Sequence, residues 1–384
     1  MDSAEREGLR PKGNVPNLRF PEFQGEWEET KIGDIAIVVG GGTPDTNTSQ
    51  YWNGKIQWFT PSEIGRNKYV YNSVRTISED GLNKSSAKLL PIGTILLSSR
   101  ATVGECSINK KECTTNQGFQ SLIPKENISN EFVYYLIQTK RKDLIRKSCG
   151  STFLEISANE VRKIVVSIPT IKEQDKIAKL LSLLDERIAT QNKIIEDLKK
   201  LKSAISENLF KEVKGDVVML SEICEISKGK QINGEFLSEK GKYYVMNGGT
   251  EPSGYYNNYN VEANTISISE GGNSCGYVQF NTSPFWSGGH CYTIQEIADN
   301  VDNLYLYHFL KSKEDAIMKL RIGSGLPNIQ KKDLAMFKIK IPTVEQQKAI
   351  STFLSSLERK AEIEERIQNA MQKEKQYLLR QMFI

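Results

Sequence analysis

Residues 168–210 read IPTIKEQDKIAKLLSLLDERIATQNKIIEDLKKLKSAISENLF, and residues 341–383 read IPTVEQQKAISTFLSSLERKAEIEERIQNAMQKEKQYLLRQMF. The two segments align without a gap at a constant offset of 173 residues. Identical pairs include Ile168/Ile341, Pro169/Pro342, Thr170/Thr343, Gln174/Gln347, Ile177/Ile350, Leu181/Leu354, Leu184/Leu357 and Phe210/Phe383. A weaker match continues upstream, where Gly150-Ser151 aligns with Gly323-Ser324 and residues 133–136 align with 306–309. The chain is therefore a tandem duplication.

Both segments are predicted to be long helices, because they contain few helix breakers and each follows a proline at a position suited to a helix start. In the first, apolar residues follow a 4-3 heptad spacing typical of a coiled coil, interrupted by Gln191 and Lys202. The residues expected to form this seam include Ile177, Leu181, Leu184 and Ile188, with Ile350, Leu354 and Leu357 in the second segment. Further along the second segment the apolar residues Ile363, Ile367 and Ala370 depart from the heptad spacing, so we expect the two helices to pair less regularly there.

A helix of about 40 residues is about 60 Å long, which suits a spacer. Two similar globular units, each followed by the same long helix, are best arranged with the helices antiparallel and the units related by pseudo-twofold symmetry. Periodicity alone leaves open a helical hairpin that only dimerises the protein.

The globular halves are predicted to be α+β domains with mixed sheets. Expected strands lie within residues 31–39, 93–100 and 162–168 of the first half and within 264–269, 276–280, 290–295 and 336–341 of the second, and each half has one expected helix, at 130–147 and at 303–320. The predicted organisation is a tail (1–26), a first domain (27–167), a first helix (168–214), a second domain (215–340) and a second helix (341–384).

Composition sets limits on the function. The chain has 38% apolar and 26% charged residues, which is typical of a soluble globular protein, and it contains no stretch that could span a bilayer. Because residues 1–26 lack the apolar core of a secretory signal, we expect a cytoplasmic protein. The six cysteines and two histidines show no metal-binding or disulfide spacing, and the net charge of +4 is mild for a nucleic-acid-binding protein.

The loops contain side chains suited to reading DNA, since Arg, Asn and Gln pair with base edges, and Ser, Thr and Lys bind phosphates. In the first half the candidates are Thr43, Asp45, Thr46, Tyr51, Trp58, Thr60, Ser62, Ser99, Arg100, Thr102, Asn116 and Gln117, with Lys140 and Arg141 as phosphate ligands. In the second half they are Lys228, Lys230, Asn247, Tyr255, Tyr256, Asn273, Ser274, Trp286 and His290. For each residue a structural role is the simpler alternative, and Gly40, Gly41 and Gly42 are expected to form a turn.

The sequence argues against an enzyme acting by itself. It has no phosphate loop, no HExxH motif, no GxSxG elbow and no signature of amino-methyltransferases. Only His290-Cys291 could suggest a nucleophile and its base, but adjacent residues on a strand point to opposite faces.

The combined motifs resemble the specificity subunits of type I restriction-modification systems over essentially the whole chain. The segments that carry the resemblance are NVPNLRFPEFQGEWEETKIGDI (14–35), GGTPDTNTSQYWNGKIQWFTPSEI (41–64), GTILLSSRATVG (93–104), TTNQGF (114–119), GSTFLEIS (150–157), NGGTEPSGYY (247–256), ISISEGGNSCGYV (266–278), FWSGGHCYTI (285–294) and the two helical segments. The two globular halves resemble different classes of target recognition domain.

The resemblance implies that each domain reads one half of an asymmetric two-part target in double-stranded DNA, and that the helices fix the spacer. It also implies a complex with two methyltransferase subunits, which use S-adenosylmethionine to methylate adenine N6, and with restriction subunits, which use ATP and magnesium. No cofactor or metal is expected on this chain itself. The alternatives are a stand-alone DNA-binding regulator, a structural dimer and, least favoured, an orphan enzyme.

Overall fold

The computed structural model describes residues 13–150, 154–323, 325 and 327–384. The chain divides into two compact units: unit 1 comprises residues 1–190 and 368–384, and unit 2 comprises residues 191–367. Part of the tail (residues 1–12), Ser151 to Phe153 of the segment 150–157, and Ser324 lie outside the described residues. No helix of the described chain is both long and apolar enough to cross a membrane.

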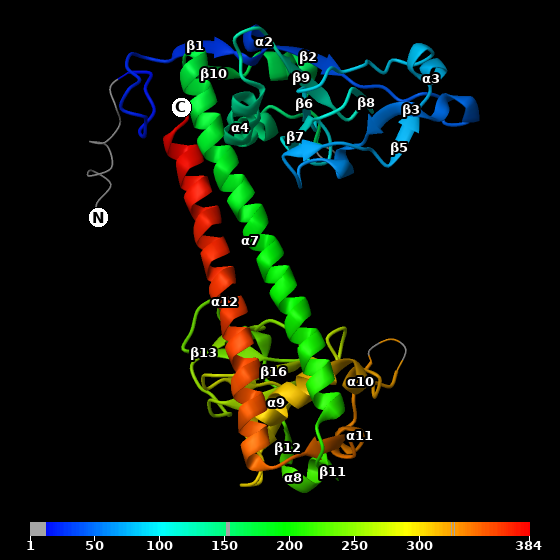
Figure 1. Ribbon diagram of the computed structural model, residues 1–384, viewed down its shortest axis with the longest axis vertical. Coiled ribbons are helices and arrows are strands. Elements are labelled where there is room, and N and C mark those ends of the chain that lie inside the picture. The colour runs from blue at the N-terminus through cyan, green and yellow to red at the C-terminus, as the bar shows by residue number, and fades with distance from the viewer. Residues whose placement is uncertain (1–12, 151–153, 324, 326) are drawn as a thin grey trace. The chain divides into compact units, whose positions relative to one another are not determined.

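Unit 1 contains a five-stranded sheet, a three-stranded sheet and a two-stranded ribbon (Figure 1). The five-stranded sheet has the order β2 (Ala36–Gly40), β9 (Gln120–Pro124), β6 (Ile95–Leu97), β7 (Cys106–Asn109) and β4 (Tyr69–Val70). The others are β5 (Arg75–Ile77), β3 (Trp52–Phe59) and β8 (Cys113–Thr115), and β1 (Glu28–Lys31) with β10 (Val165–Ile168). The short helices are α2 (Ile32–Ile35), α3 (Glu79–Asn83), α4 (Asn130–Thr139), α5 (Arg141–Arg146) and α6 (Ala158–Arg162), with 3-10 turns η1 (Ser49–Tyr51) and η2 (Pro61–Glu63).

Unit 2 repeats this plan with one strand fewer in its largest sheet. That sheet has the order β12 (Glu225–Lys228), β18 (Cys291–Gln295), β15 (Thr265–Ser269) and β16 (Val278–Asn281). The others are β14 (Gly254–Tyr256), β13 (Tyr243–Met246) and β17 (Trp286–Ser287), and β11 (Asp216–Met219) with β19 (Lys338–Ile341). The short helices are α8 (Leu220–Ile223), α9 (Asn303–Ser312), α10 (Glu314–Met318) and α11 (Lys331–Ala335), with the 3-10 turn η3 (Gly234–Phe236).

Two long helices run through both units: α7 (Ile171–Glu212) and α12 (Val344–Gln381), coloured green and orange-red in Figure 1. In unit 1 the start of α7 joins the core formed by the sheet and α4, and the chain end around Phe383 packs into the same core. In unit 2 the end of α7 and the start of α12 join the core around α9, where Phe210 and Leu354 are fully buried. Each domain core is therefore completed by the long helices.

The heptad seam predicted for α7 is confirmed. Ile177 and Leu181 are buried, Leu184 and Ile188 are half-buried, and the polar interruption Gln191 is also buried. On α12, Leu354 is buried and Ile350 and Leu357 are half-buried. The expected irregularity of α12 is also confirmed, because Ile363 and Ile367 lie outside the seam with 48% and 42% of their surface exposed, while polar Glu364 and Lys375 occupy seam positions.

The polar seam residues pair in the same way in both repeats. In unit 2, Lys202 of α7 forms an ion pair with Glu358 of α12 at 2.6 Å. In unit 1, Lys375 of α12 forms an ion pair with Asp185 of α7 at 2.6 Å. Lys375 and Glu358 are the 173-residue equivalents of Lys202 and Asp185, so the duplication has preserved both partners.

Three local expectations are corrected by the structure. Residues 32–35 form helix α2 within the expected strand at 31–39. Each expected single helix is split, because Thr139 and Ser312 donate their hydroxyls back to carbonyls three residues earlier, and the next residues, Lys140 and Lys313, leave helical geometry. The glycines at 40–42 continue from β2 without a turn.

Candidate nucleic-acid interface

In unit 1 the end of β8 and the loop that joins it to β9, residues 115–119, bond to three other segments. The joining backbone bonds are Gly42 N–H to Thr115 O (2.8 Å), Asn116 N–H to Phe59 O (3.0 Å) and Ser99 N–H to Gly118 O (2.8 Å). Glycine is needed at position 42, because a Cβ there would collide with the backbone at Ser86 and Ala87. Segments that are far apart in the sequence therefore form one loop cluster.

Most of the candidates in unit 1 have accessible side chains, and several of them lie in this cluster. The exposed or half-buried ones are Thr43, Asp45, Thr46, Tyr51, Thr60, Ser62, Arg100, Thr102, Asn116 and Gln117. Thr43 donates its hydroxyl to the Gln117 side chain, which links two of the loops. Arg100 forms an ion pair with Glu155 at 2.8 Å, and the following Ala101 has a left-handed backbone with φ of 58°. Such a conformation in a non-glycine residue is uncommon and often marks functional loops.

Two candidates are buried and are therefore withdrawn as DNA contacts. Trp58 is 5% exposed, donates its ring N–H to the Gly42 carbonyl at 2.9 Å and packs edge-on against Trp52. Ser99 is fully buried. Both residues hold the loops together by hydrogen bonds, from the Trp58 ring to the Gly42 carbonyl and from the Ser99 N–H to the Gly118 carbonyl.

The two basic candidates on the α4–α5 segment are already engaged within unit 1. Lys140 donates to the carbonyl of Ile384 at 2.9 Å, and burial lowers its pKa from the usual value. Arg141 pairs with Glu105 at 2.7 Å. Their assignment as phosphate ligands stays a prediction, since each side chain retains donors beyond these contacts.

Unit 2 builds an equivalent cluster around residues 287–291, which precede and begin β18. The joining bonds are Lys230 N–H to Ser287 O (2.9 Å), Gly229 N–H to Cys291 O (2.9 Å), Gly288 N–H to Met246 O (2.8 Å) and Glu270 N–H to His290 O (2.9 Å). Side chains strengthen it, since Asn247 accepts the His290 backbone N–H at 3.1 Å and Trp286 donates to the Lys230 carbonyl at 2.9 Å.

The structure brings most of the unit 2 candidates together. Lys228, Lys230 and His290 are exposed, and Asn247 and Trp286 are half-buried beside them. The candidates Tyr256, Asn273 and Ser274 lie on adjoining segments, and Tyr256 packs edge-on against Trp286 at 5.2 Å. Tyr255 instead faces residues 238–241, through the bridge with Ser238 and contact at Gly241.

The two clusters share one backbone frame. Ser98 N–H bonds to Glu105 O in unit 1, and Ser269 N–H bonds to Tyr277 O in unit 2. Likewise the carbonyl of Ser99 accepts the Ile156 N–H at 3.1 Å, and that of Glu270 accepts the Ile329 N–H at 2.8 Å. The side chains on this frame differ, so one scaffold presents two different chemical surfaces.

Sequence reasoning missed two acidic residues in the clusters, Glu155 and Glu270. Glu155 is the partner of Arg100, and Glu270 bonds to Lys228 at 2.6 Å. No sequence pattern indicates either residue, because each is identified only by its bond to a basic candidate.

The structure does not arrange His290 and Cys291 as a base and its nucleophile. Burial raises the pKa of the Cys291 thiol to about 11, which disfavours the reactive thiolate, and this thiol donates to the Tyr292 carbonyl, not to His290. No group of three or more His, Cys, Asp or Glu side chains in the described chain is arranged to hold a metal.

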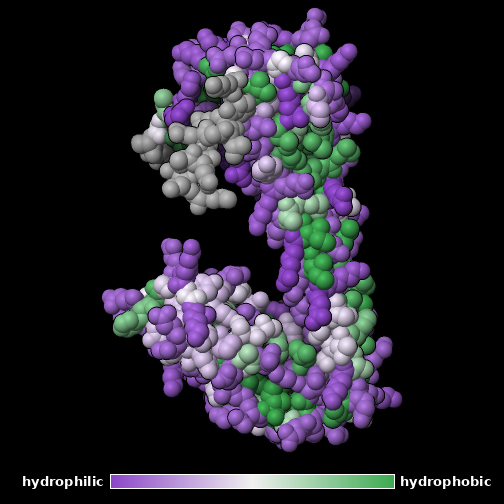
Figure 2. All heavy atoms as spheres, turned by 90° about the vertical axis from the view of Figure 1, so that its left-hand side faces the viewer, coloured by the Kyte–Doolittle hydropathy of each residue, from purple (hydrophilic) through white to green (hydrophobic). Residues whose placement is uncertain are grey.

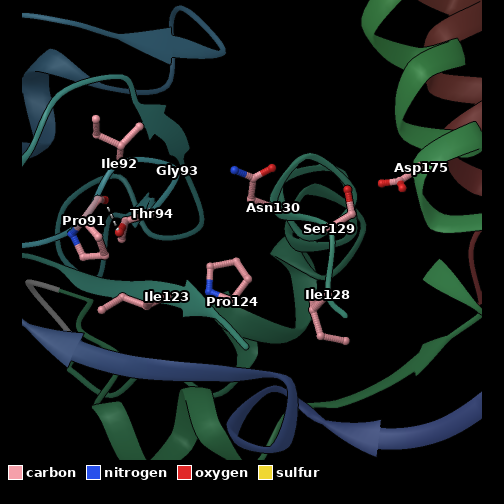
Figure 3. Close-up of a pocket in the computed structure, with 10 residues that line it drawn as sticks. All are labelled: Pro91, Ile92, Gly93, Thr94, Ile123, Pro124, Ile128, Ser129, Asn130 and Asp175. Atoms are coloured by element: carbon pink, nitrogen blue, oxygen red, sulfur yellow. Dashed lines mark hydrogen bonds between the residues drawn. The ribbon is translucent and has the colours of Figure 1, made fainter. Parts of the chain in front are cut away.

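Unit 1 also has an open pocket of about 460 Å³, drawn in Figure 3. It lies at the start of α4 and is lined by Ser129, Asn130, Asp175 of α7 and mainly apolar residues of the segments 91–94 and 123–128. None of the DNA-reading candidates lines it.

Known proteins resemble this chain in both sequence and fold. The type I restriction modification DNA specificity domain matches residues 24–200 and again residues 212–373. The MjaIX specificity subunit of Methanocaldococcus jannaschii is 40% identical over 189 residues, and the EcoR124I/EcoR124II specificity subunit of Escherichia coli is 31% identical over 175 residues. These matches cover 48% and 44% of this chain but only 44% and 43% of those relatives, less than half of their length.

Other matches extend over nearly the whole chain. The MjaVIII specificity subunit of M. jannaschii is 24% identical over 404 residues, covering 94% of this chain and 92% of its own. The crystal structure of a type I restriction-modification S subunit from M. genitalium has a TM-score of 0.66 at 20% identity and covers 96% of this chain and 99% of its own, which shows a shared fold. With both halves matched, this chain belongs to the type I restriction modification DNA specificity domain family and carries that domain twice.

Proposed function

We propose that this chain is the DNA sequence-recognition subunit of a type I restriction-modification complex and is not itself catalytic. Each unit would read one half of a two-part target in double-stranded DNA through its loop cluster. The observation that carries this proposal is the repeated backbone frame with different side chains, found in a chain that carries the specificity domain twice. Identical side chains on a repeated frame would favour a palindromic target, so the difference favours an asymmetric one.

The long helices are proposed to set the spacer between the half-sites and to bind the methylating subunits. Apolar side chains reach the surface along these helices, as Figure 2 shows in green. In unit 2 they include Ile194, Leu201, Ile363 and Ile367, with exposed fractions between 40% and 51%. Exposed apolar surface of this kind commonly marks an interaction site. A stand-alone DNA-binding regulator does not require an apolar surface for partner subunits, so this surface disfavours that alternative.

In the proposed complex, two methyltransferase subunits bind S-adenosylmethionine and transfer its methyl group to adenine N6. Restriction subunits supply cleavage with ATP and magnesium, and the assembly acts in the cytoplasm. This chain would contribute recognition alone, with no cofactor of its own. The domain boundaries proposed for recognition remain 27–167 and 215–340.

Domain exchange tests the proposal. We expect that replacing residues 27–167 with another domain of the same class, in cells that also express the methylating subunit, changes one half of the methylated motif and leaves the other half and the gap unchanged. Mapping methylated adenines across a genome by single-molecule sequencing measures this. The matched control replaces residues 215–340 and should change the opposite half; a change in both halves after either exchange would contradict the two-reader proposal.

A further inference from the structure

Glu270 is a buried acidic residue within the loop cluster of unit 2. It follows β15 directly and is 7% exposed. Its backbone is fixed on both sides, because its N–H donates to the His290 carbonyl and its carbonyl accepts the Ile329 N–H. The carboxylate is therefore held at a defined place beneath the surface of the cluster.

The two carboxylate oxygens of Glu270 have different surroundings. Oε1 accepts hydrogen bonds from the ammonium of Lys228 at 2.6 Å and from the hydroxyl of Tyr292 at 3.1 Å. Oε2 is buried and has no hydrogen-bond partner among the described residues. The Nδ1 atom of His290 is 3.6 Å from Oε2, just beyond hydrogen-bond distance.

A buried carboxylate oxygen without a donor is unfavourable, so its presence calls for a reason. The side chains beside it supply one, since Lys228 is 51% exposed and His290 is 63% exposed. A small rotation of the imidazole would place Nδ1–H on Oε2 and leave Nε2 on the outer side. One buried anion would then orient two exposed polar groups side by side.

Unit 1 carries its charges elsewhere on the same frame. In unit 1 the position of Glu270 is occupied by Ser99. Arg100 and Glu155 form a β-bridge and an ion pair there, whereas the equivalent β-bridge of unit 2 joins the uncharged residues Gly271 and Asn328. Because the frame is common and the charged groups are not, these groups are the natural carriers of a difference in sequence preference between the units.

We infer that Glu270 is a positioning residue that orients Lys228 to read a guanine in the half-site recognised by unit 2, with the outward Nε2 of His290 as an acceptor beside it. This inference rests on the proposed function. Guanine offers two acceptors, N7 and O6, in the major groove, and the Lys228 ammonium retains donors beyond the one given to Glu270. Glu270 itself need not touch DNA.

The test is selection of bound sequences from a randomised DNA library by the full-length chain, assembled with its methylating subunits if the chain alone binds too weakly. The variants are Glu270→Gln, Lys228→Met and His290→Ala, with Glu225→Gln as the control, an exposed carboxylate on the same strand as Lys228. We expect Glu270→Gln and Lys228→Met each to reduce the guanine preference at one position by about tenfold. The double variant should be no worse than Lys228→Met alone, because the two residues act as a unit.

The outcomes are distinguishable. Loss of preference at one position in one half-site, with the other half-site and the melting temperature unchanged, supports the inference. A wild-type two-part motif that survives in all three variants overturns it and leaves the proposed function intact. A wild-type chain that selects no motif overturns the proposed function as well. If Glu270→Gln lowers the melting temperature, the inference is tested by Lys228→Met and His290→Ala, which change exposed residues. An unaltered DNA motif in these two variants then rejects the inference.

Discussion

At the scale of single residues, His308 should make the stability of unit 2 sensitive to mild acid. It is 2% exposed on α9, and its Nε2 lies 2.9 Å from the Ser355 hydroxyl. Burial lowers the pKa of His308 to about 4, with nearby Glu358 opposing and Lys202 assisting that shift. Because the folded pKa lies below the unfolded value, stability is complete at neutral pH and falls as the pH drops from about 6.5 towards 4.

We expect the free energy of unfolding of unit 2 to fall by about 2 kcal/mol between pH 7 and pH 5 from this group. Urea unfolding at the two pH values measures it. The variant His308→Gln should lose this part of the pH dependence, whereas His290→Gln, which changes the other histidine of the chain, should keep it. Equal pH dependence in the parent and in His308→Gln would show that the buried imidazole is not responsible.

The residue scale also shows where sequence-based prediction of the site succeeds and fails. Lys228 and His290 were predicted from their chemistry, and the structure places both in one cluster. Glu270 was not predicted, because an acidic residue repels DNA phosphates and its bond to Lys228 is visible only in the structure. Trp58 was also predicted as a contact residue, but it is buried through its packing on Trp52 of the same strand and its bond to the Gly42 carbonyl, neither of which the sequence shows.

At the scale of elements, a buried glutamine fixes the start of each long helix to the domain that precedes it. Gln347 donates to the carbonyls of Pro342 (2.9 Å) and Asn300 (3.0 Å) and accepts the N–H of Asp302 at 2.7 Å. Gln174 makes the equivalent bonds to Pro169 and Ser129 in unit 1. This explains why glutamine is identical in both repeats.

Replacement of Gln347 by leucine should lower the free energy of unfolding of unit 2 by about 3 kcal/mol, because buried backbone groups would lose their partners. Urea unfolding followed by circular dichroism measures the loss, and amide exchange at Asp302 should become faster. The neighbouring Gln346 is exposed, so Gln346→Leu serves as the matched control and should be close to neutral. Comparable losses in both variants would contradict the assigned role.

The long helices were the best predicted elements, because heptad spacing reports directly on which face is buried. The short elements were predicted less well. Helix α2 has only four residues, and the breaks at Lys140 and Lys313 depend on hydroxyl-to-carbonyl bonds that leave no periodic signal. Thr139 and Ser312 are equivalent in the alignment of the two repeats, and this repeated hydroxyl residue is the sequence feature that marks the two helix breaks.

At the scale of the whole molecule, the continuity of α7 and α12 through both units allows the proposed spacer to be altered without touching either loop cluster. A heptad copied from residues 184–190 and inserted after Thr190, together with one copied from 357–363 and inserted after Ile363, keeps the seam in register. Seven residues add about 10 Å of helix, which corresponds to about three base pairs of duplex.

If the helices set the spacer, the methylated motif should keep both half-sites and gain about three base pairs in its gap. Single-molecule sequencing of methylated DNA from cells carrying this variant measures the gap. A four-residue insertion after Thr190 alone serves as the control: it shifts the seam of one helix and leaves Lys202 out of step with Glu358, so assembly should fail. An unchanged gap in an active double-heptad variant would mean that another part of the complex fixes the distance between the half-sites.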